Sequence, residues 1–206
     1  MIILLLFTNP LLFFMVVVSI VFALTIHEYS HAQVADSLGD HTARHQGRLT
    51  INPLAHLDPF GTLLLLLVGF GWGRPVPFNP FNLRNQKWGP GLIALAGPFS
   101  NFLMATIVGL SLRFFEMPNI ALVVFFSVFI WLNILLGVFN LMPIFPLDGS
   151  HILSALFPRF SEKVKAIFSQ QPFLAIPVII LFMFFIIIPF VCRPLFELIT
   201  GMPSPF

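Results

Sequence analysis

Residues 16–39 read VVVSIVFALTIHEYSHAQVADSLG, a long apolar run that ends in a cluster of ionisable side chains. Positions i and i+4 of an α-helix lie on one face, so a helix through this run points the imidazoles of His27 and His31 in the same direction. Gly39 then ends the helical composition. An ionisable residue deep in a membrane costs roughly 2.5–3.5 kcal/mol, so three of them within residues 27–31 need a compensating partner. We predict that His27 and His31 bind one zinc ion and that Glu28 is the general base that acts on a zinc-activated water.

The composition of the whole chain is that of a membrane protein. Of its 206 residues, 58% are hydrophobic and only 9% are charged, whereas a soluble domain has roughly 25% charged residues. The net charge of +2 is too small to indicate a nucleic-acid partner, and the single cysteine, Cys192, excludes an internal disulfide. No basic residue precedes the first apolar run, so we expect a retained membrane anchor rather than a cleaved signal peptide.

The intervals between charged residues predict the membrane spans. Four uncharged intervals reach the roughly 20 residues that a spanning helix needs, namely 1–27, 88–112, 117–147 and 166–192. The interval 59–73 is shorter. If this segment re-enters, eight of the ten basic residues lie on one side of the membrane and only Arg113 and Arg193 lie on the other, which is the bias expected for a cytoplasmic side. If the segment spans, the basic residues are divided almost evenly between the two sides. We therefore predict an all-α polytopic membrane protein with four transmembrane helices, the last at about 172–192, and both termini outside.

The segment 72–82, WGRPVPFNPFN, contains three prolines and cannot form a helix interior. We expect it to form a short extended edge within a re-entrant region at 58–80. Neither an internal repeat nor a low-complexity linker appears along the chain. The simplest organisation is one membrane-embedded domain over 1–206, with a catalytic core at about 10–160.

Two histidines do not complete a catalytic zinc site, which has three protein ligands and an open position. The candidates are the other four histidines, at positions 41, 45, 56 and 151, and Asp148 in NLMPIFPLDG, residues 140–149. Asp148 is the best candidate, because it emerges from a span that descends to the same side as the helix of His27. The alternative is that Asp148 serves as the N-cap of a helix over 149–157.

HEYSH on the first membrane helix, followed far downstream by NLMPIFPLDG, resembles the site-2 protease family of intramembrane zinc metalloproteases. GPFSN at 97–101 is similar to an element of the next core helix of that family, and the segments 52–59 and 70–77 resemble its compact prokaryotic branch without PDZ or CBS domains. The resemblance covers residues 10–160. It implies one Zn²⁺ per chain, held by His27, His31 and Asp148, with Glu28 as the base.

The resemblance also suggests that Asn140 lies near the substrate carbonyl. For Asn140 and for Asn101, hydrogen bonding between helices is the alternative to a role at the substrate or its oxyanion, because both lie in or near apolar spans.

The function that the resemblance implies is hydrolysis of peptide bonds in membrane-spanning proteins, within a prokaryotic cell membrane and toward its cytoplasmic side. The edge near 70–80 would then pair with an unfolded substrate strand. Two other classes share some of these features: a membrane metal transporter and a non-proteolytic membrane scaffold. The intervals 88–112 and 166–192 offer few polar residues for a transport path, and the intact set of His27, Glu28, His31 and Asp148 argues against a scaffold.

Overall fold

A computed structural model of the chain describes residues 2–69, 71–170, 177 and 179–205. Four helices in this part are long and apolar enough to cross a membrane: α2 (Pro10–Ser37), α5 (Gly89–Phe114), α6 (Ile120–Asn140) and a last helix over Ile179–Thr200. The last helix contains the π-helical segment η4 (Met183–Cys192) and α10 (Arg193–Thr200). The prediction of an all-α fold with four membrane-spanning helices is thus confirmed.

The bounds of the last helix differ from the expected 172–192. Residues 171–176 and 178 of that range lie outside the described residues, and the described helix continues through Arg193 to Thr200. We expected the span to end at Arg193 because it carries the next charge, but a charged side chain does not interrupt helical hydrogen bonding. The helix ends instead at Gly201, whose φ of +70° is a left-handed conformation that favours glycine.

Shorter elements connect the long helices. They are η1 (Ile2–Leu4) and α1 (Leu5–Thr8) before α2, then α3 (Thr42–His45), η2 (Pro53–Ala55), α4 (Pro59–Val68) and η3 (Pro80–Asn82) before α5, and α7 (Asp148–Leu156) and α8 (Pro158–Gln170) after α6. At 1.5 Å per residue, α4 is about 15 Å long, half of the roughly 30 Å of a bilayer's hydrocarbon core. The length of α4 therefore agrees with a segment that enters the membrane and returns.

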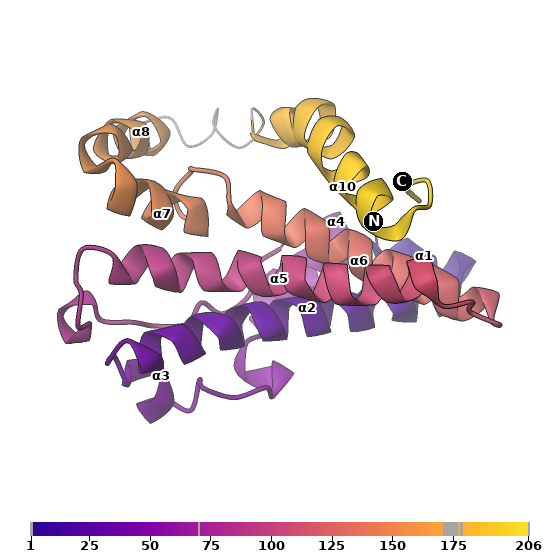
Figure 1. Cartoon of the computed structure of the whole chain (residues 1–206), viewed down its shortest axis with the longest axis horizontal. Helices are drawn as coiled ribbons and strands as arrows, with labels where there is room; N and C mark the ends of the chain where they lie inside the picture. The colour runs from indigo at the N-terminus through magenta and orange to yellow at the C-terminus, as the bar shows by residue number, and fades with distance from the viewer. Residues whose placement is uncertain (1, 70, 171–176, 178, 206) are drawn as a thin grey trace.

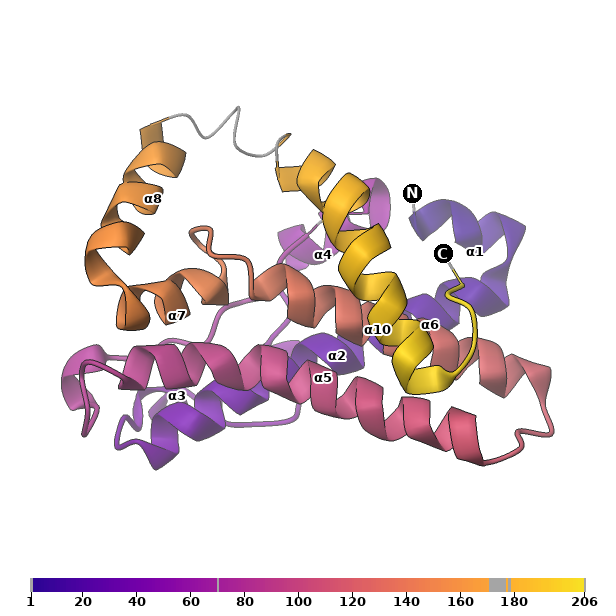
Figure 2. The ribbon, with the colours of Figure 1, turned by 45° about the horizontal axis from the view of Figure 1, so that its top comes forward.

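The long helices α2, α5 and α6 run side by side (Figure 1), and the last helix packs across α5 and α6 (Figure 2). A buried apolar cluster joins α5, α6 and the last helix, and it is formed by Ala105, Ile130, Trp131, Ile134, Val138, Cys192 and Phe196. Both views place the two chain ends at one end of the bundle and α7 and α8 toward the other. A chain that begins and ends on the same side of a membrane crosses it an even number of times, and the position of the two chain ends agrees with this.

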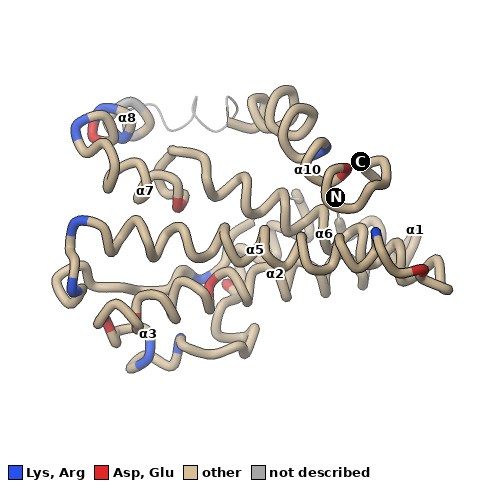
Figure 3. The backbone as a smooth tube through the Cα atoms, viewed as in Figure 1, with Lys and Arg blue, Asp and Glu red and all other residues tan. Residues whose placement is uncertain are grey.

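The charged side chains are unevenly distributed over this bundle. Most Lys and Arg residues lie in the half of the molecule that contains α3 and α8 (Figure 3). The asymmetry follows the division of basic residues that favoured four crossings over five.

An extended segment, residues 72–79, crosses beside α2, and we call it the strap. Gly73 forms an isolated antiparallel bridge with Leu57, and the Arg74 N–H donates to the carbonyl of His56 at 2.7 Å. Pro75 and Pro77 keep the segment from becoming helical. The expected extended edge is therefore present, although within the described residues it forms this single bridge and no strand.

Candidate metal centre

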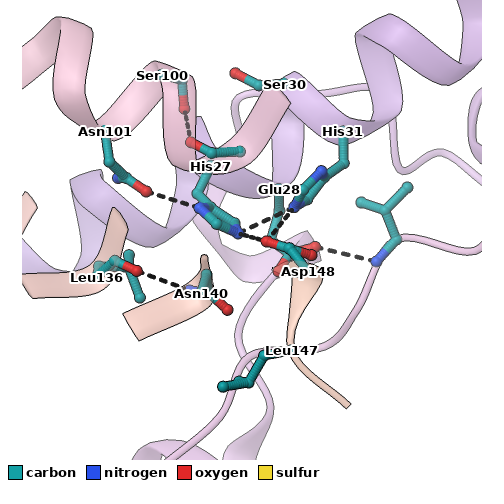
Figure 4. Close-up of polar contacts among 12 residues, drawn as sticks. His27, Glu28, Ser30, His31, Ser100, Asn101, Leu136, Asn140, Leu147 and Asp148 are labelled. Carbon is teal, nitrogen blue, oxygen red and sulfur yellow. Dashed lines mark hydrogen bonds and ion pairs between the residues drawn. The ribbon is translucent and has the colours of Figure 1, made fainter. Parts of the chain in front are cut away.

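Three potential metal ligands converge between α2 and the start of α7. His27 and His31 lie one helical turn apart, and their Nε2 atoms are 3.0 Å from each other. Oδ2 of Asp148 lies 3.1 Å from Nε2 of His27 and 3.3 Å from Nε2 of His31 (Figure 4). Within the described part of the chain, this is the one group of histidine, cysteine or acidic residues placed to hold a metal ion. The structure thus brings together the three residues that we expected to be ligands.

Asp148 reaches this position because α7 starts close against the end of α6. A Cβ added at Gly149 would collide with the carbonyl oxygens of Leu141 and Met142, so only glycine permits this approach. Leu147 stands at the N-cap position, and no side chain caps α7. Asp148 therefore points at the histidines instead of capping its own helix, and the N-cap alternative is wrong.

The outer nitrogen of each imidazole is already committed to a hydrogen bond. Nδ1 of His31 lies 2.6 Å from the carbonyl oxygen of Ile93 on α5, and a carbonyl can only accept, so Nδ1 carries the hydrogen. In the neutral ring, Nε2 then holds a lone pair directed toward Asp148. A ligating histidine in a metal site is usually oriented by such a partner.

Asn101 orients His27 in the same way. The amide nitrogen of Asn101 donates to the carbonyl of Ala23 at 3.1 Å and to Oδ1 of Asn133 at 3.0 Å. Its Oδ1 is thereby left to accept from Nδ1 of His27 at 2.7 Å. The amide of Asn133 is fixed in turn by donating to the carbonyl of Phe129 at 2.9 Å. This chain of donors and acceptors, all in the bundle interior, leaves the lone pair of His27 on Nε2.

Two imidazole lone pairs and a carboxylate at these distances repel one another unless a cation lies between them. Oδ2 of Asp148 is buried without a hydrogen-bond partner, as expected for an atom that ligates an ion. Two neutral imidazoles and one carboxylate form a donor set that suits zinc in a catalytic site, where a further position stays open.

Gly97 on α5 provides the room beside these ligands. A Cβ at this position would lie 2.6 Å from Cε1 and Nε2 of His27, and closer still to Nε2 of His31. Any other residue would fill the space that faces both metal-binding nitrogens. The absence of a side chain at residue 97 is therefore a requirement of the site.

Glu28 lies against the strap. Its side chain is buried among α2 and the strap, and Oε2 accepts a hydrogen bond of 3.0 Å from the N–H of Val76 (Figure 4). A guanidinium nitrogen of Arg48 donates to the carbonyl oxygen of Arg74 and, at 3.3 Å, to that of Pro75. The strap is thus held at the residues that precede its contact with Glu28.

The two asparagines differ in their surroundings. Asn101 is 0% exposed and its amide atoms bond only to neighbouring helices, which is the helix-to-helix alternative. Asn140 is half-buried at the end of α6 near the site, and its amide nitrogen donates to the carbonyl of Leu136 at 3.0 Å (Figure 4).

The remaining histidines lie outside the metal-binding group. Nε2 of His56 faces the carbonyl of Thr50 at 2.7 Å. The ring of His151 packs edge-on against Phe78, 6.0 Å between centroids. Burial lowers the pKa of His151, although the Asp148 carboxylate acts in the opposite direction.

Two residues of this site did not enter the sequence-based prediction: Asn133, which fixes Asn101, and Arg48, which holds the strap. A polar residue within an apolar span is a signal that could have drawn attention to Asn133. No comparable signal marks Arg48, because it looks like one of several basic residues near the end of a span.

A bundle of apolar helices that brings a His-Glu-x-x-His helix and a distant aspartate to one point defines the class of membrane-embedded metallopeptidases. The model of "Peptidase family M50" matches residues 115–184, the part of the chain that contains Asp148. Together with the relatives described next, this shows that the chain belongs to peptidase family M50.

"Putative zinc metalloprotease YwhC" of Bacillus subtilis is 43% identical over 150 residues, which cover 69% of this chain and 68% of that protein. "Putative zinc metalloprotease Rip2" of Mycolicibacterium smegmatis is 30% identical over 198 residues, which cover 91% of this chain and 72% of that protein. "Zinc metalloprotease MJ0392" of Methanocaldococcus jannaschii is 31% identical over 80 residues, which cover 39% of this chain and 23% of that protein. No solved structure matches the chain.

Proposed function

We propose that this chain is an intramembrane zinc metalloprotease that hydrolyses peptide bonds of membrane-spanning proteins, with residues 1–206 acting as one peptidase domain. The observation that carries the proposal is the convergence of His27, His31 and Asp148 beside Glu28, in a bundle of helices long and apolar enough to cross a membrane. At 1.5 Å per residue, His27 lies about 15 Å along α2 from Ser37, so the group lies inside the bundle and not at its tip.

The proposed mechanism divides the work among five side chains. His27, His31 and Asp148 hold the zinc ion, and Asn101 keeps His27 in the tautomer that exposes its Nε2 lone pair. When bound, zinc supplies Lewis acidity, which lowers the pKa of water and polarises a peptide carbonyl. Glu28 takes a proton from the attacking water and returns it to the leaving amide nitrogen. Oε2 of Glu28 accepts from Val76, so Oε1 is the atom that we assign to this proton.

Asn140 is the residue that we assign to the substrate carbonyl. It lies at the end of α6 close to Asp148 (Figure 4), and a rotation about its side-chain bonds would exchange the bond to Leu136 for one to substrate. A donor aimed at the developing oxyanion stabilises the transition state.

The strap is the proposed docking edge for an unfolded substrate segment. Pro75 and Pro77 have no N–H, and the N–H of Val76 is bonded to Glu28. Over these three residues the strap can offer carbonyl oxygens only. A substrate strand would therefore have to donate its own N–H groups to this stretch.

We assign the end of the bundle that carries α3 and α8 to the cytoplasmic side of a prokaryotic membrane. The excess of Lys and Arg at that end is the basis of the assignment (Figure 3). The polar segments that adjoin the site at this end give water its route to Glu28. Reporter fusions to the loop after α5 and to the loop before it measure the orientation directly.

The test is cleavage of a membrane-inserted reporter by the purified protein in liposomes. Glu28→Gln keeps the shape of the side chain and removes the base, so we expect one zinc per chain and a loss of rate of about 10²- to 10⁴-fold. Asp148→Asn is expected to lose zinc and activity together. Cleavage by Glu28→Gln at the wild-type rate would rule out Glu28 as the base.

The same preparation separates the rival classes. Zinc uptake into the liposomes without reporter cleavage would favour a transporter, and neither uptake nor cleavage would favour a scaffold. The buried amides of Asn101 and Asn133 favour the peptidase, because they are used to orient a ligand and do not line a path.

A further inference from the structure

Arg48 is a buried cation with an unusual set of partners. It is 8% exposed, and no carboxylate of the described residues lies within ion-pair distance of it. Its Nε is buried without a hydrogen-bond partner. Burying a charge costs several kcal/mol unless it is paired. The Glu28 carboxylate acts on this guanidinium electrostatically, although from beyond ion-pair distance, so the burial of Arg48 calls for an explanation beyond stability.

The hydrogen bonds of the Arg48 side chain go to the backbone of the strap. One nitrogen, Nη2, bonds to the carbonyl oxygens of both Arg74 and Pro75. Nη2 carries two hydrogens, so this single nitrogen can donate to two successive carbonyls. Arg48 itself is fixed by its own N–H, which donates to the carbonyl of Ala43 at 2.8 Å.

The other end of the strap is held by a second buried side chain. Oδ2 of Asp40 accepts from the N–H of Asn79 at 2.6 Å, and Oδ1 accepts from Nδ2 of Asn82 at 2.9 Å. Asp40 is 0% exposed. The strap is thus fastened before and after Val76, and its position over Glu28 is defined by groups outside the metal centre.

Val76 is the point at which this scaffold meets the catalytic machinery. Between two prolines it carries the sole N–H of residues 75–77, and that N–H donates to Oε2 of Glu28 at 3.0 Å. Pro77 also restricts Val76 to extended conformations. A shift of the strap cannot be compensated by a neighbouring N–H, since neither neighbour has one.

We propose that Arg48 is a positioning residue for the general base: by binding the carbonyls of Arg74 and Pro75, it holds the Val76 N–H on Glu28 and so fixes the Glu28 carboxylate for proton transfer. The inference rests on the proposed function, since it assigns Glu28 the proton. Arg48 acts through the strap and does not touch the zinc ligands. Its loss should therefore lower kcat at unchanged zinc content, and any change in KM would report the role of the strap in docking substrate.

The experiment uses the full-length protein in liposomes with the membrane-inserted reporter. Arg48→Gln is expected to lower kcat roughly 10- to 100-fold, the range seen when groups that orient active-site ligands are removed. Arg48→Lys retains a cation with N–H donors, but its ammonium lacks the planar group that fixes their direction, so partial rescue is expected. Arg44→Gln is the matched control, because Arg44 lies in the same segment and its exposed side chain pairs with the buried carboxylate of Asp36 and not with the strap.

A second variant removes the donor itself. Replacing Val76 by its α-hydroxy acid converts the amide to an ester, which deletes the N–H and keeps the side chain. We expect the same loss of kcat at unchanged zinc content, and no further loss when this change is combined with Arg48→Gln. The control is the same ester at Ile51, an exposed residue of the preceding loop.

The outcomes separate this inference from the proposed function. If wild-type protein does not cleave the reporter, the proposed function fails. If wild-type protein cleaves and Glu28→Gln does not, but Arg48→Gln and the Val76 ester keep the wild-type kcat, only the positioning role fails. Loss of zinc or of folded protein in Arg48→Gln, combined with normal kcat in the Val76 ester, would show that Arg48 is merely structural.

Discussion

Gly97→Ala is the most informative single substitution at the metal centre, because helix propensity and site geometry predict opposite effects. Residue 97 lies in the interior of α5. There, exchanging glycine for alanine ordinarily stabilises a helix by about 0.5–1 kcal/mol. The structure instead places the new methyl 2.6 Å from Cε1 and Nε2 of His27, and closer to Nε2 of His31.

The size of the effect follows from the overlap. Carbon atoms in contact prefer about 3.5–4.0 Å, so the methyl overlaps His27 by about 1 Å, and α5 or the imidazoles must move. Overpacking of this kind costs about 1–3 kcal/mol, and overlap with two rings puts this site at the upper end. At 1.4 kcal/mol for each factor of ten, a cost of about 3 kcal/mol weakens zinc binding by roughly 100-fold.

The assay is the zinc content of the purified variant, followed by competition with a chelator. We expect far less than one zinc per chain and a corresponding loss of reporter cleavage. Gly137→Ala in α6 is the control, because its Cβ would meet only the ring of Phe102 at 3.1–3.3 Å. That variant should bind zinc like the wild type. Wild-type zinc affinity in Gly97→Ala would refute the claim that residue 97 borders the ion.

Three further predictions concern the groups around the centre. Asn101→Leu removes the acceptor for Nδ1 of His27, and should weaken zinc binding roughly 10- to 100-fold in chelator competition; unchanged affinity would contradict the orienting role. Burial opposes ionisation of Asp40, but hydrogen bonds to its carboxylate hold its pKa below the ordinary value. The ionised carboxylate therefore stabilises the folded protein fully above the unfolded pKa of about 3.9, and this stabilisation is lost as pH falls through the folded pKa. Hydrogen exchange of residues 74–82 should thus speed up below about pH 4 after correction for intrinsic rates, whereas in Asp40→Asn it should be fast throughout. Removing zinc should lower Tm, because an ion at 1,000 times its Kd stabilises the folded state by about 4 kcal/mol; in Asp148→Asn a chelator should leave Tm unchanged.

The sequence was sufficient to predict the long helices and, from local pattern alone, two of the three proposed zinc ligands. The length of an uncharged apolar interval indicates the length of a span, because nearly every residue of a membrane-spanning helix has to be apolar. The pairing of His27 with His31 follows from helical periodicity alone. Span length and this pairing both depend only on residues that are neighbours along the chain. The distribution of basic residues favoured re-entry of the segment 59–73 over crossing, and the short length of α4 agrees with that prediction.

The orientation of each ligand was decided by tertiary packing. Whether Asp148 caps α7 or faces the histidines depends on how closely α7 starts against α6, which Gly149 permits but does not reveal in the sequence. The tautomer of His27 is set by Asn101 and Asn133, which come from two other helices.

The room for the ion and the placement of Glu28 were likewise decided in three dimensions. Gly97 matters because α5 packs directly against the two histidines of α2 at that residue, and Arg48 matters because its guanidinium reaches a strap far along the chain. Hydropathy and periodicity are local properties of the sequence, and they determine which residues are able to act as ligands or as the base. Distances between helices arise from the packing of the whole bundle, and they determine which of those residues come together in one site.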